Sequence, residues 1–327
     1  RTVVIDPGHG GDSTGAEYYN LSEKDLNLTV SNYIKDDLEQ YDHVKVFLTR
    51  TDDIDSSYAV RMDYAKAKKA DYIISIHFNE SDAHDQIGSQ IYVPSKKKLS
   101  EEILPVAFGI ADSLESAGIV SGGIYSCVDD HGNDYYGLLR QAARANIPSL
   151  IVEHLYMDRK EYLPFINSEE ALSRLAALDA EAIAKGLQLH SEALAVDDPE
   201  METPGWEVTA LDESFSHPSL AKVSVSEYEQ IKDDSCLFTL KIQGKDEDKD
   251  LYGYRVSVDG GKHFRPLIRF KDGREEAFYD LVLRKGDSPA ICVLVFNEDH
   301  LSVVSDPLNP FLGITLKQSE EEEAVEE

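Results

Sequence analysis

The stretch "VVIDPGHGGDSTGAEYYNLSEKDLNL" (residues 3–28) decides how the first part of this chain folds. It opens with an apolar run and turns through a glycine-rich bend that contains His9. It then enters a segment in which apolar residues recur every four positions from Leu26 to Leu38. An apolar run followed by an amphipathic helix is the first half of a β-α-β unit. The pattern therefore predicts a strand, a bend, and a helix whose first turn holds Glu23.

Short apolar runs alternate with amphipathic helical patterns through residues 1–190. Strands that alternate with helices imply β-α-β units, and hence an α/β fold with a mostly parallel sheet and helices on both faces. We assign this fold to residues 1–190. The runs predicted as buried strands are TVVID (2–6), VKVFLT (44–49), DYIISIH (71–77), SQIYVP (89–94) and SLIVE (149–153).

The pattern changes after a stretch rich in Pro, Asp and Glu, which we interpret as a linker over 191–205. From Trp206 onward, apolar residues alternate with period two in eight short runs, the first of which is WEVTALD (206–212). This is typical of an all-β sandwich, and residues 206–318 resemble a fibronectin type III or immunoglobulin-like module. The acidic end, 319–327, is predicted to be a disordered tail.

Composition limits the possible partners and compartments. The chain of 327 residues has 62 acidic and 32 basic residues, a net charge of −30 that argues against non-specific nucleic-acid binding. No apolar run is long enough to predict a transmembrane segment. Cys236 and Cys292 fall in the predicted sandwich, where they could form an inter-sheet disulfide or remain two buried thiols. The sequence leaves both states open.

Three groups that can bind a metal or transfer a proton stand at or just after the ends of predicted strands. His9 follows the strand 2–6, His77 ends the strand 71–77, and Glu153 ends the strand 149–153. The carboxyl ends of parallel strands share one edge of a sheet, and ligands bind in the crevice there. We therefore expect these three side chains to gather at one rim.

Glu23 adds a fourth group to that rim. It lies three residues before Leu26 and seven before Val30, which places it on the apolar face of the predicted helix. A buried carboxylate requires a cationic partner because desolvation without one is costly. A glutamate that only complements the helix dipole is the alternative; it explains the position in the sequence but not the face.

Two imidazoles and a carboxylate, with a fourth position open, are the ligand set of a catalytic zinc site. His9, Glu23 and His77 supply this set. Zinc in such a site polarises a carbonyl and lowers the pKa of water toward about 7. Glu153 lies on the same rim but outside the ligand set, where it could move the proton. The four residues predict metal-assisted hydrolysis of an amide-like bond.

The segments VIDPGHGG, EKDLNL, ADYIISIHFN and IPSLIVE, in this order and spacing, resemble the zinc-dependent N-acetylmuramoyl-L-alanine amidases of the amidase 3 family. The resemblance covers about residues 2–187. It implies His9, Glu23 and His77 as zinc ligands and Glu153 as the catalytic acid–base. It also implies cleavage of the amide between the lactyl group of N-acetylmuramic acid and L-alanine. Peptidoglycan as substrate implies an extracellular or cell-wall location, with a signal peptide removed.

Some features depart from the family pattern or leave alternatives. The family usually continues from the catalytic glutamate into Gly-Phe, whereas here EHLYMD (153–158) follows. Strand alternation directs the extra His154 away from Glu153, which favours a structural role. Arg61 is expected to anchor an acidic partner, and Asp6 either bonds a ligand histidine or caps the bend.

Two other functions stay open beside the amidase. One is a non-catalytic module for cell-wall binding or scaffolding, since a fold alone does not establish an activity. The other is a zinc peptidase or deacylase that acts on a different amide, because loops rather than metal ligands set the substrate. The predicted sandwich could attach the chain to the cell wall or to a protein partner.

Overall fold

The computed structural model describes residues 1–195, 207–232, 234–271, 274–312 and 314. The chain forms two compact units, residues 1–215 and 216–327. Most of the predicted linker (196–205) and the whole acidic tail (319–327) lie outside the described residues. Among the described helices, none is long and apolar enough to cross a membrane.

A seven-stranded sheet forms the centre of the first unit, in the order β4-β1-β5-β8-β6-β7-β9. Neighbouring strands run parallel except for β6 and β8, so the prediction of a mostly parallel sheet is confirmed. Its strands are β1 (Thr2–Pro7), β4 (Lys45–Leu48), β5 (Tyr72–Asn79), β6 (Ser89–Tyr92), β7 (Ser121–Val128), β8 (Ser149–Tyr156) and β9 (Val208–Asp212). A small hairpin, β2 (Glu17–Tyr18) and β3 (Leu21–Ser22), follows the first bend.

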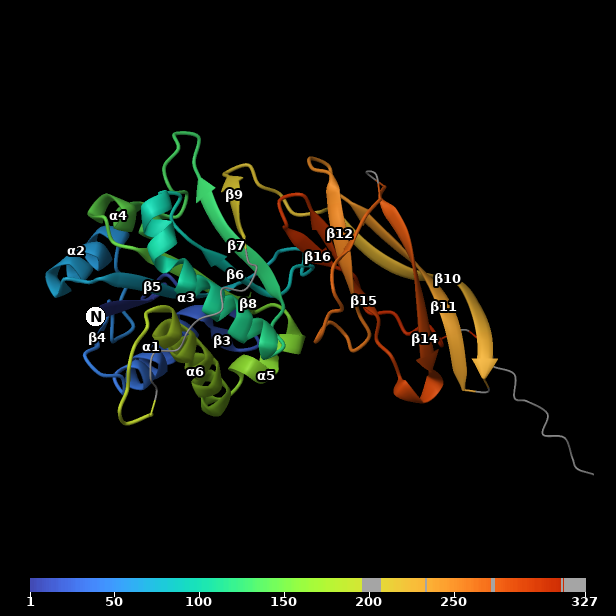
Figure 1. Cartoon of the computed structure of the whole chain (residues 1–327), viewed down its shortest axis with the longest axis horizontal. Coiled ribbons are helices and arrows are strands. Elements are labelled where there is room, and N and C mark those ends of the chain that lie inside the picture. The colour runs from blue at the N-terminus through green and yellow to red at the C-terminus, as the bar shows by residue number, and fades with distance from the viewer. Residues whose placement is uncertain (196–206, 233, 272–273, 313, 315–327) are drawn as a thin grey trace, which may run out of the picture. The chain divides into compact units, whose positions relative to one another are not determined.

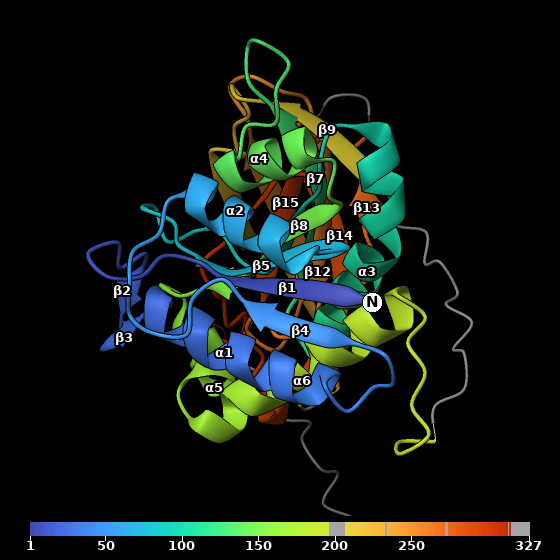
Figure 2. The ribbon, with the colours of Figure 1, turned by 90° about the vertical axis from the view of Figure 1, so that its left-hand side faces the viewer.

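Helices cover both faces of this sheet, as Figures 1 and 2 show. On one face α1 and α3 both pack against α6, and on the other face α2 packs against α4. The helices are α1 (Glu23–Leu38), α2 (Tyr58–Lys68), α3 (Lys97–Ser116), α4 (Gly137–Ala145), α5 (Leu163–Ile166) and α6 (Glu169–Gly186), with a 3₁₀ turn at Lys160–Tyr162. The central strands β1, β5 and β8 are therefore buried on both sides, which explains their continuous apolar runs.

Two strands of this sheet differ from the sequence prediction. β7 was not predicted, because Gly122 and Gly123 interrupt its apolar pattern. The run predicted as the first sandwich strand does form a strand, but Val208–Asp212 pairs in parallel with β7 instead of joining the C-terminal sheets. Strand propensity identifies a strand, but a short strand carries little information about which edge it will pair with.

The second unit is an all-antiparallel β region, as predicted. One sheet has the order β10-β11-β14 and the other β13-β12-β15-β16. Phe238, Leu240, Val293 and Val295 contribute to the core and are fully buried. Cys236 and Cys292 are both buried and do not form the disulfide, and Cys127 is a buried thiol as well. The strands are β10 (Leu220–Lys232), β11 (Ser235–Lys245), β12 (Leu251–Ser257), β13 (Ile268–Arg269), β14 (Glu276–Arg284), β15 (Cys292–Asn297) and β16 (Ser302–Val304), with a 3₁₀ turn at Lys285–Asp287.

Candidate metal centre

His9 stands in a tight bend just after β1. Its φ of 58° lies in the left-handed region, which is uncommon for a residue other than glycine, so its surroundings must hold it there. Two buried arginines do so. Arg61 donates to the backbone oxygens of Pro7 and His9, both at 2.7 Å. Arg50 donates to the carbonyl of Gly8 at 2.8 Å. These bonds fix the backbone that carries the His9 ring.

Glu23 is the first residue of α1, and its side chain turns inward to the end of the sheet. Its exposed fraction is 4%. Its carboxylate accepts hydrogen bonds from the backbone N–H groups of Ala16 (2.9 Å) and Phe78 (3.2 Å). Asn27, one turn along α1, donates to it at 3.3 Å. A carboxylate bound by fixed donors keeps one position, which a metal ligand requires.

The three predicted ligands meet at this point. Glu23 Oε1 lies 2.9 Å from His77 Nδ1, and Glu23 Oε2 lies 3.2 Å from His9 Nε2. One possible ligand atom from each residue lies within 4.8 Å of the others. Two imidazole nitrogens and a carboxylate oxygen at this spacing can share one divalent ion of the zinc class. The donor set therefore fits a metal.

Glycines make room for these side chains. A Cβ at Gly8 would lie 2.2 Å from Cε1 of His77, and a Cβ at Gly15 would lie 2.2 Å from Oε2 of Glu23. The backbone at Gly8 and Gly15 therefore lies too close to the side chains of His77 and Glu23 for a residue with a Cβ at either position. This explains the glycines in the bend better than turn geometry alone.

The groups around the ligands partly differ from expectation. The second nitrogen of His9 lies 3.0 Å from the hydroxyl of Ser13 and is not bonded to Asp6. Asp6 instead forms an ion pair with Arg61 at 2.8 Å and accepts from Ser75 at 2.8 Å. Neither expected role of Asp6 is therefore observed, whereas Arg61 does anchor an acidic partner. Asp6 is buried beneath the bend and fixes it through Arg61.

The close contact between Glu23 and His77 shifts the pKa values of both side chains. Burial acts to raise the pKa of Glu23, but hydrogen bonds from His77 and His9 hold it well below its usual range. Burial acts to lower the pKa of His77, but its bond to Glu23 and the charge of Glu153 raise it to about 9. These shifts show that the site favours a negative Glu23 beside positive charge, which a metal ion would supply.

Glu153 lies in β8 directly opposite His77 in β5, where the two residues are paired in register. Burial raises the pKa of Glu153 to about 7, and the charge of Glu23 adds to this effect while His77 opposes it. Within the described part of the chain, its carboxylate makes no hydrogen bond or ion pair with another residue. A carboxylate with a pKa near neutral and no fixed partner can accept and release a proton.

His154 points to the opposite side of β8, as strand alternation predicts. Its Nε2 lies 2.6 Å from Asp179 Oδ2 in α6, and its ring stacks on Phe78 with centroids 5.1 Å apart. The residue is fully buried. It therefore belongs to the core behind the candidate site and is not a further ligand.

A cavity of about 370 Å³ opens beside the candidate metal centre. Its lining includes His9 and His77, so a molecule bound there would lie against the ligand set. The remaining lining comes from β1, the bend and the start of α2, namely Asp6, Gly8, Ser13, Asp55, Ser56, Ser57, Tyr58 and Arg61.

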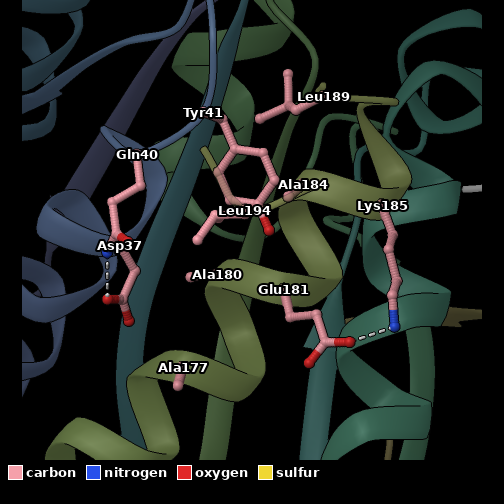
Figure 3. A pocket seen from close by; sticks show the side chains of 10 residues that line it. All are labelled: Asp37, Gln40, Tyr41, Ala177, Ala180, Glu181, Ala184, Lys185, Leu189 and Leu194. Carbon is pink, nitrogen blue, oxygen red and sulfur yellow. Dashed lines mark hydrogen bonds and ion pairs between the residues drawn. The ribbon is translucent and has the colours of Figure 1, made fainter. Parts of the chain in front are cut away.

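A second cavity of about 320 Å³ lies between the ends of α1 and α6 (Figure 3). The ring of Tyr41 and the small side chains of Ala180 and Ala184 line it, and Glu181 pairs with Lys185 at its edge. Its lining has no histidine, cysteine or predicted site residue. We therefore place the candidate chemistry in the first cavity.

Sequence reasoning missed Arg50 and Asn27. Both are buried and both bond the backbone of Gly8, Asn27 at 3.2 Å. Asn27 carried a usable signal, because it lies one helical turn after Glu23 on the same face. Arg50 carried none, because the residues of the bend that it bonds, Pro7 and Gly8, are more than forty positions away in the chain.

Residues 3–185 match the family model described as N-acetylmuramoyl-L-alanine amidase. The probable N-acetylmuramoyl-L-alanine amidase AmiB of Haemophilus influenzae is 33% identical over 137 residues, 41% of this chain and 31% of that protein. The N-acetylmuramoyl-L-alanine amidase CwlM of Bacillus licheniformis is 28% identical over 201 residues, 59% of this chain and 72% of that protein. Among solved structures, Cwp6 from Clostridium difficile aligns with a TM-score of 0.53 at 28% identity, over 57% of this chain and 29% of that one.

Proposed function

The chain belongs to the Amidase_3 family of N-acetylmuramoyl-L-alanine amidases, and from this premise we propose how its residues cleave peptidoglycan. The first unit is an amidase domain, a hydrolase. The bond cleaved is the amide that joins the lactyl group of N-acetylmuramic acid to L-alanine of the stem peptide. The observation that carries the proposal is the convergence of His9, Glu23 and His77 beside a cavity, with Glu153 on the neighbouring strand.

We propose zinc as the ion held by His9, Glu23 and His77. Two nitrogen donors and one oxygen donor suit zinc, and three protein ligands leave a position open for reaction. When bound, zinc supplies a Lewis acid that polarises a carbonyl and makes water more acidic. The hydrogen bonds that Glu23 accepts from Ala16 and Phe78 support a fixed ligand geometry.

Glu153 is assigned the proton transfers. Its carboxylate takes a proton from water as the oxygen attacks the amide carbon, and it delivers that proton to the nitrogen of L-alanine as the C–N bond breaks. The products are a free lactyl carboxylate on the sugar and a free stem-peptide amine. A pKa of about 7 suits both halves of this cycle, since the group must accept and then donate.

The test is digestion of purified peptidoglycan with and without a metal chelator, followed by mass analysis of the soluble products. The proposal expects intact stem peptides with a free N-terminal L-alanine, and none when the chelator is present. Cleavage inside the stem peptide would instead support a zinc peptidase. Binding to peptidoglycan without any product would support a non-catalytic module.

For the rest of the chain we propose an accessory role. We assign residues 1–190 to catalysis and the β region that follows to a fibronectin type III-like module that attaches the enzyme to the cell wall or to a protein partner. Its support is two antiparallel sheets with a shared apolar core. Peptidoglycan as substrate supports an extracellular or cell-wall location for the protein.

A further inference from the structure

One wall of the active-site cavity comes from the segment that leads into α2. Asp55, Ser56, Ser57 and Tyr58, here called the 55–58 wall, line the same cavity as His9 and His77. Ser57 is the N-cap of α2, and its hydroxyl oxygen accepts from the N–H of Val60 at 3.4 Å. The wall is thus anchored to a regular helix rather than to a free loop.

Tyr58 presents an open aromatic surface that is held in place. Its exposed fraction is 52%, which is large for a tyrosine beside a cavity. A Cβ at Gly137 would lie 2.5 Å from two carbons of the Tyr58 ring, so the ring packs against the backbone where α4 begins. A ring that is packed on one face and exposed on the other can stack on a ligand with little loss of side-chain conformational entropy.

The residues before α4 connect this ring to the catalytic glutamate. Tyr136 immediately precedes Gly137, and its ring lies 4.4 Å from that of Tyr92. Burial raises the pKa of Tyr136, and the negative charge of Glu153 contributes to the shift. The segment Tyr136–Gly137 therefore backs the Tyr58 ring and also lies near enough to Glu153 to respond to its charge.

The polar groups of the wall suit an uncharged ligand that donates hydrogen bonds from hydroxyl or amide groups. The Asp55 carboxylate forms no hydrogen bond or ion pair with any residue that the structure describes, and it can accept from a ligand hydroxyl. The cavity offers the hydroxyls of Ser13, Ser56 and Ser57 beside it. Arg61, the one arginine in the lining, is buried and already bonded to Asp6 and to the bend.

We infer that the 55–58 wall binds the N-acetylmuramic acid ring, with Tyr58 stacked on its C–H face and Asp55 accepting from its 6-hydroxyl group or its acetamido N–H. The inference rests on the proposed function and assigns the sugar side of the scissile amide to this wall. A stem-peptide carboxylate would meet Asp55 without a compensating cation, so the peptide extends away from the wall.

The test compares two small substrates that share the scissile bond: N-acetylmuramoyl-L-alanyl-D-isoglutamine, and D-lactoyl-L-alanyl-D-isoglutamine, which lacks the sugar. The wild-type zinc enzyme should show a higher kcat/KM for the first. Tyr58→Ala should lower kcat/KM about tenfold for the sugar-bearing substrate, the loss expected for one stacked ring, and leave the lactoyl substrate unchanged.

Two control variants separate this loss from general damage. Tyr58→Phe keeps the ring and should keep the preference. Val60→Ala changes a residue of the same helix that is 59% exposed and lies outside the cavity, and it should behave as wild type. An equal loss on both substrates in Tyr58→Ala, or no loss on either, would overturn the inference.

A binding measurement tests the sugar site independently of amide hydrolysis. Titration with the methyl glycoside of N-acetylglucosamine, which has the same acetamido sugar ring and no carboxylate, followed by NMR, should give an affinity that Tyr58→Ala weakens about tenfold. If the wild type binds the glycoside but hydrolyses neither substrate, the proposed function fails and the sugar site stands. If it hydrolyses both substrates equally and shows no glycoside binding, the sugar site fails and the proposed function stands.

Discussion

His154 and Asp179 form a fully buried pair beneath the active site, with Nε2 of the histidine 2.6 Å from Oδ2 of the aspartate. The other ring nitrogen lies 2.9 Å from the carbonyl oxygen of His77. Both ring nitrogens face oxygen atoms, and the pKa of His154 is raised because Asp179 outweighs the effect of burial, which favours the imidazolium form. A charged pair thus fastens β8 to α6 and to the backbone of a proposed zinc ligand.

Removing one member of this pair should be costly. His154→Leu leaves the Asp179 charge buried without a partner, and we expect the free energy of unfolding to fall by about 3–5 kcal/mol. The double variant His154→Leu with Asp179→Leu removes both charges and should recover most of that loss. Denaturant unfolding measures all three proteins. A double variant no more stable than the single one would contradict the buried ion pair.

The same pair predicts a pH dependence. Burial acts to lower the pKa of His154, but the charge and hydrogen bond of Asp179 outweigh it, and the pKa is raised above 6.5. The folded state therefore holds this proton more tightly than the unfolded state. Its stabilisation is complete below about pH 6.5 and is lost as pH rises through the raised pKa. The unfolding free energy of the wild type should therefore fall relative to that of the double variant as pH rises through the raised pKa.

Glu153→Gln separates metal binding from proton transfer. The amide cannot take up a proton, so hydrolysis should fall at least about 100-fold while zinc content is unchanged. Because the pKa of Glu153 is raised to about 7, its effect on stability favours the folded state at low pH and is lost as pH rises toward that value. The metal-free variant should therefore melt higher than the metal-free wild type at pH 8, and the gap should shrink toward pH 4.5.

Gly8→Ala tests the close approach of the backbone to His77. A Cβ there would lie 2.2 Å from the ring, so the ring must move and zinc affinity should fall about 10–100-fold in a competition with a chelating dye. Gly286→Ala is the matched control, because no atom lies within 4 Å of its added Cβ. Unchanged zinc affinity in Gly8→Ala would show that the ring position does not depend on this glycine.

Metal removal should destabilise the first unit. Zinc that binds only the folded state adds about 2.7 kcal/mol at a free concentration 100 times its dissociation constant. Melting temperatures with added zinc and with chelator should therefore differ in the wild type. His77→Ala loses a ligand and should show no such difference, which calorimetry can check. A zinc-dependent shift that persists in His77→Ala would place the ion elsewhere.

The sequence by itself determined which side chains gather at the edge of the sheet. His9 follows one apolar strand, and His77 and Glu153 lie near the ends of two others. Parallel strands expose their carboxyl ends on one edge whatever their order. The position of Glu23 relative to Leu26 on a helical face gave the fourth group. These inferences needed only the spacing of apolar residues along the chain. That spacing follows from the face that each strand or helix must bury.

The tertiary structure decided which residues far apart in the chain contact one another, because the spacing of apolar residues does not specify this. Arg50 bonds Gly8 and Asp179 bonds His154 across the fold, and Val208–Asp212 pairs with a strand 84 residues earlier in the chain. Such contacts depend on the distance and direction of side chains after packing, and no local pattern specifies them. The sequence by itself thus determined which functional groups reach the site. Packing determined how deeply they are buried and which partners they bond, and these set their pKa values.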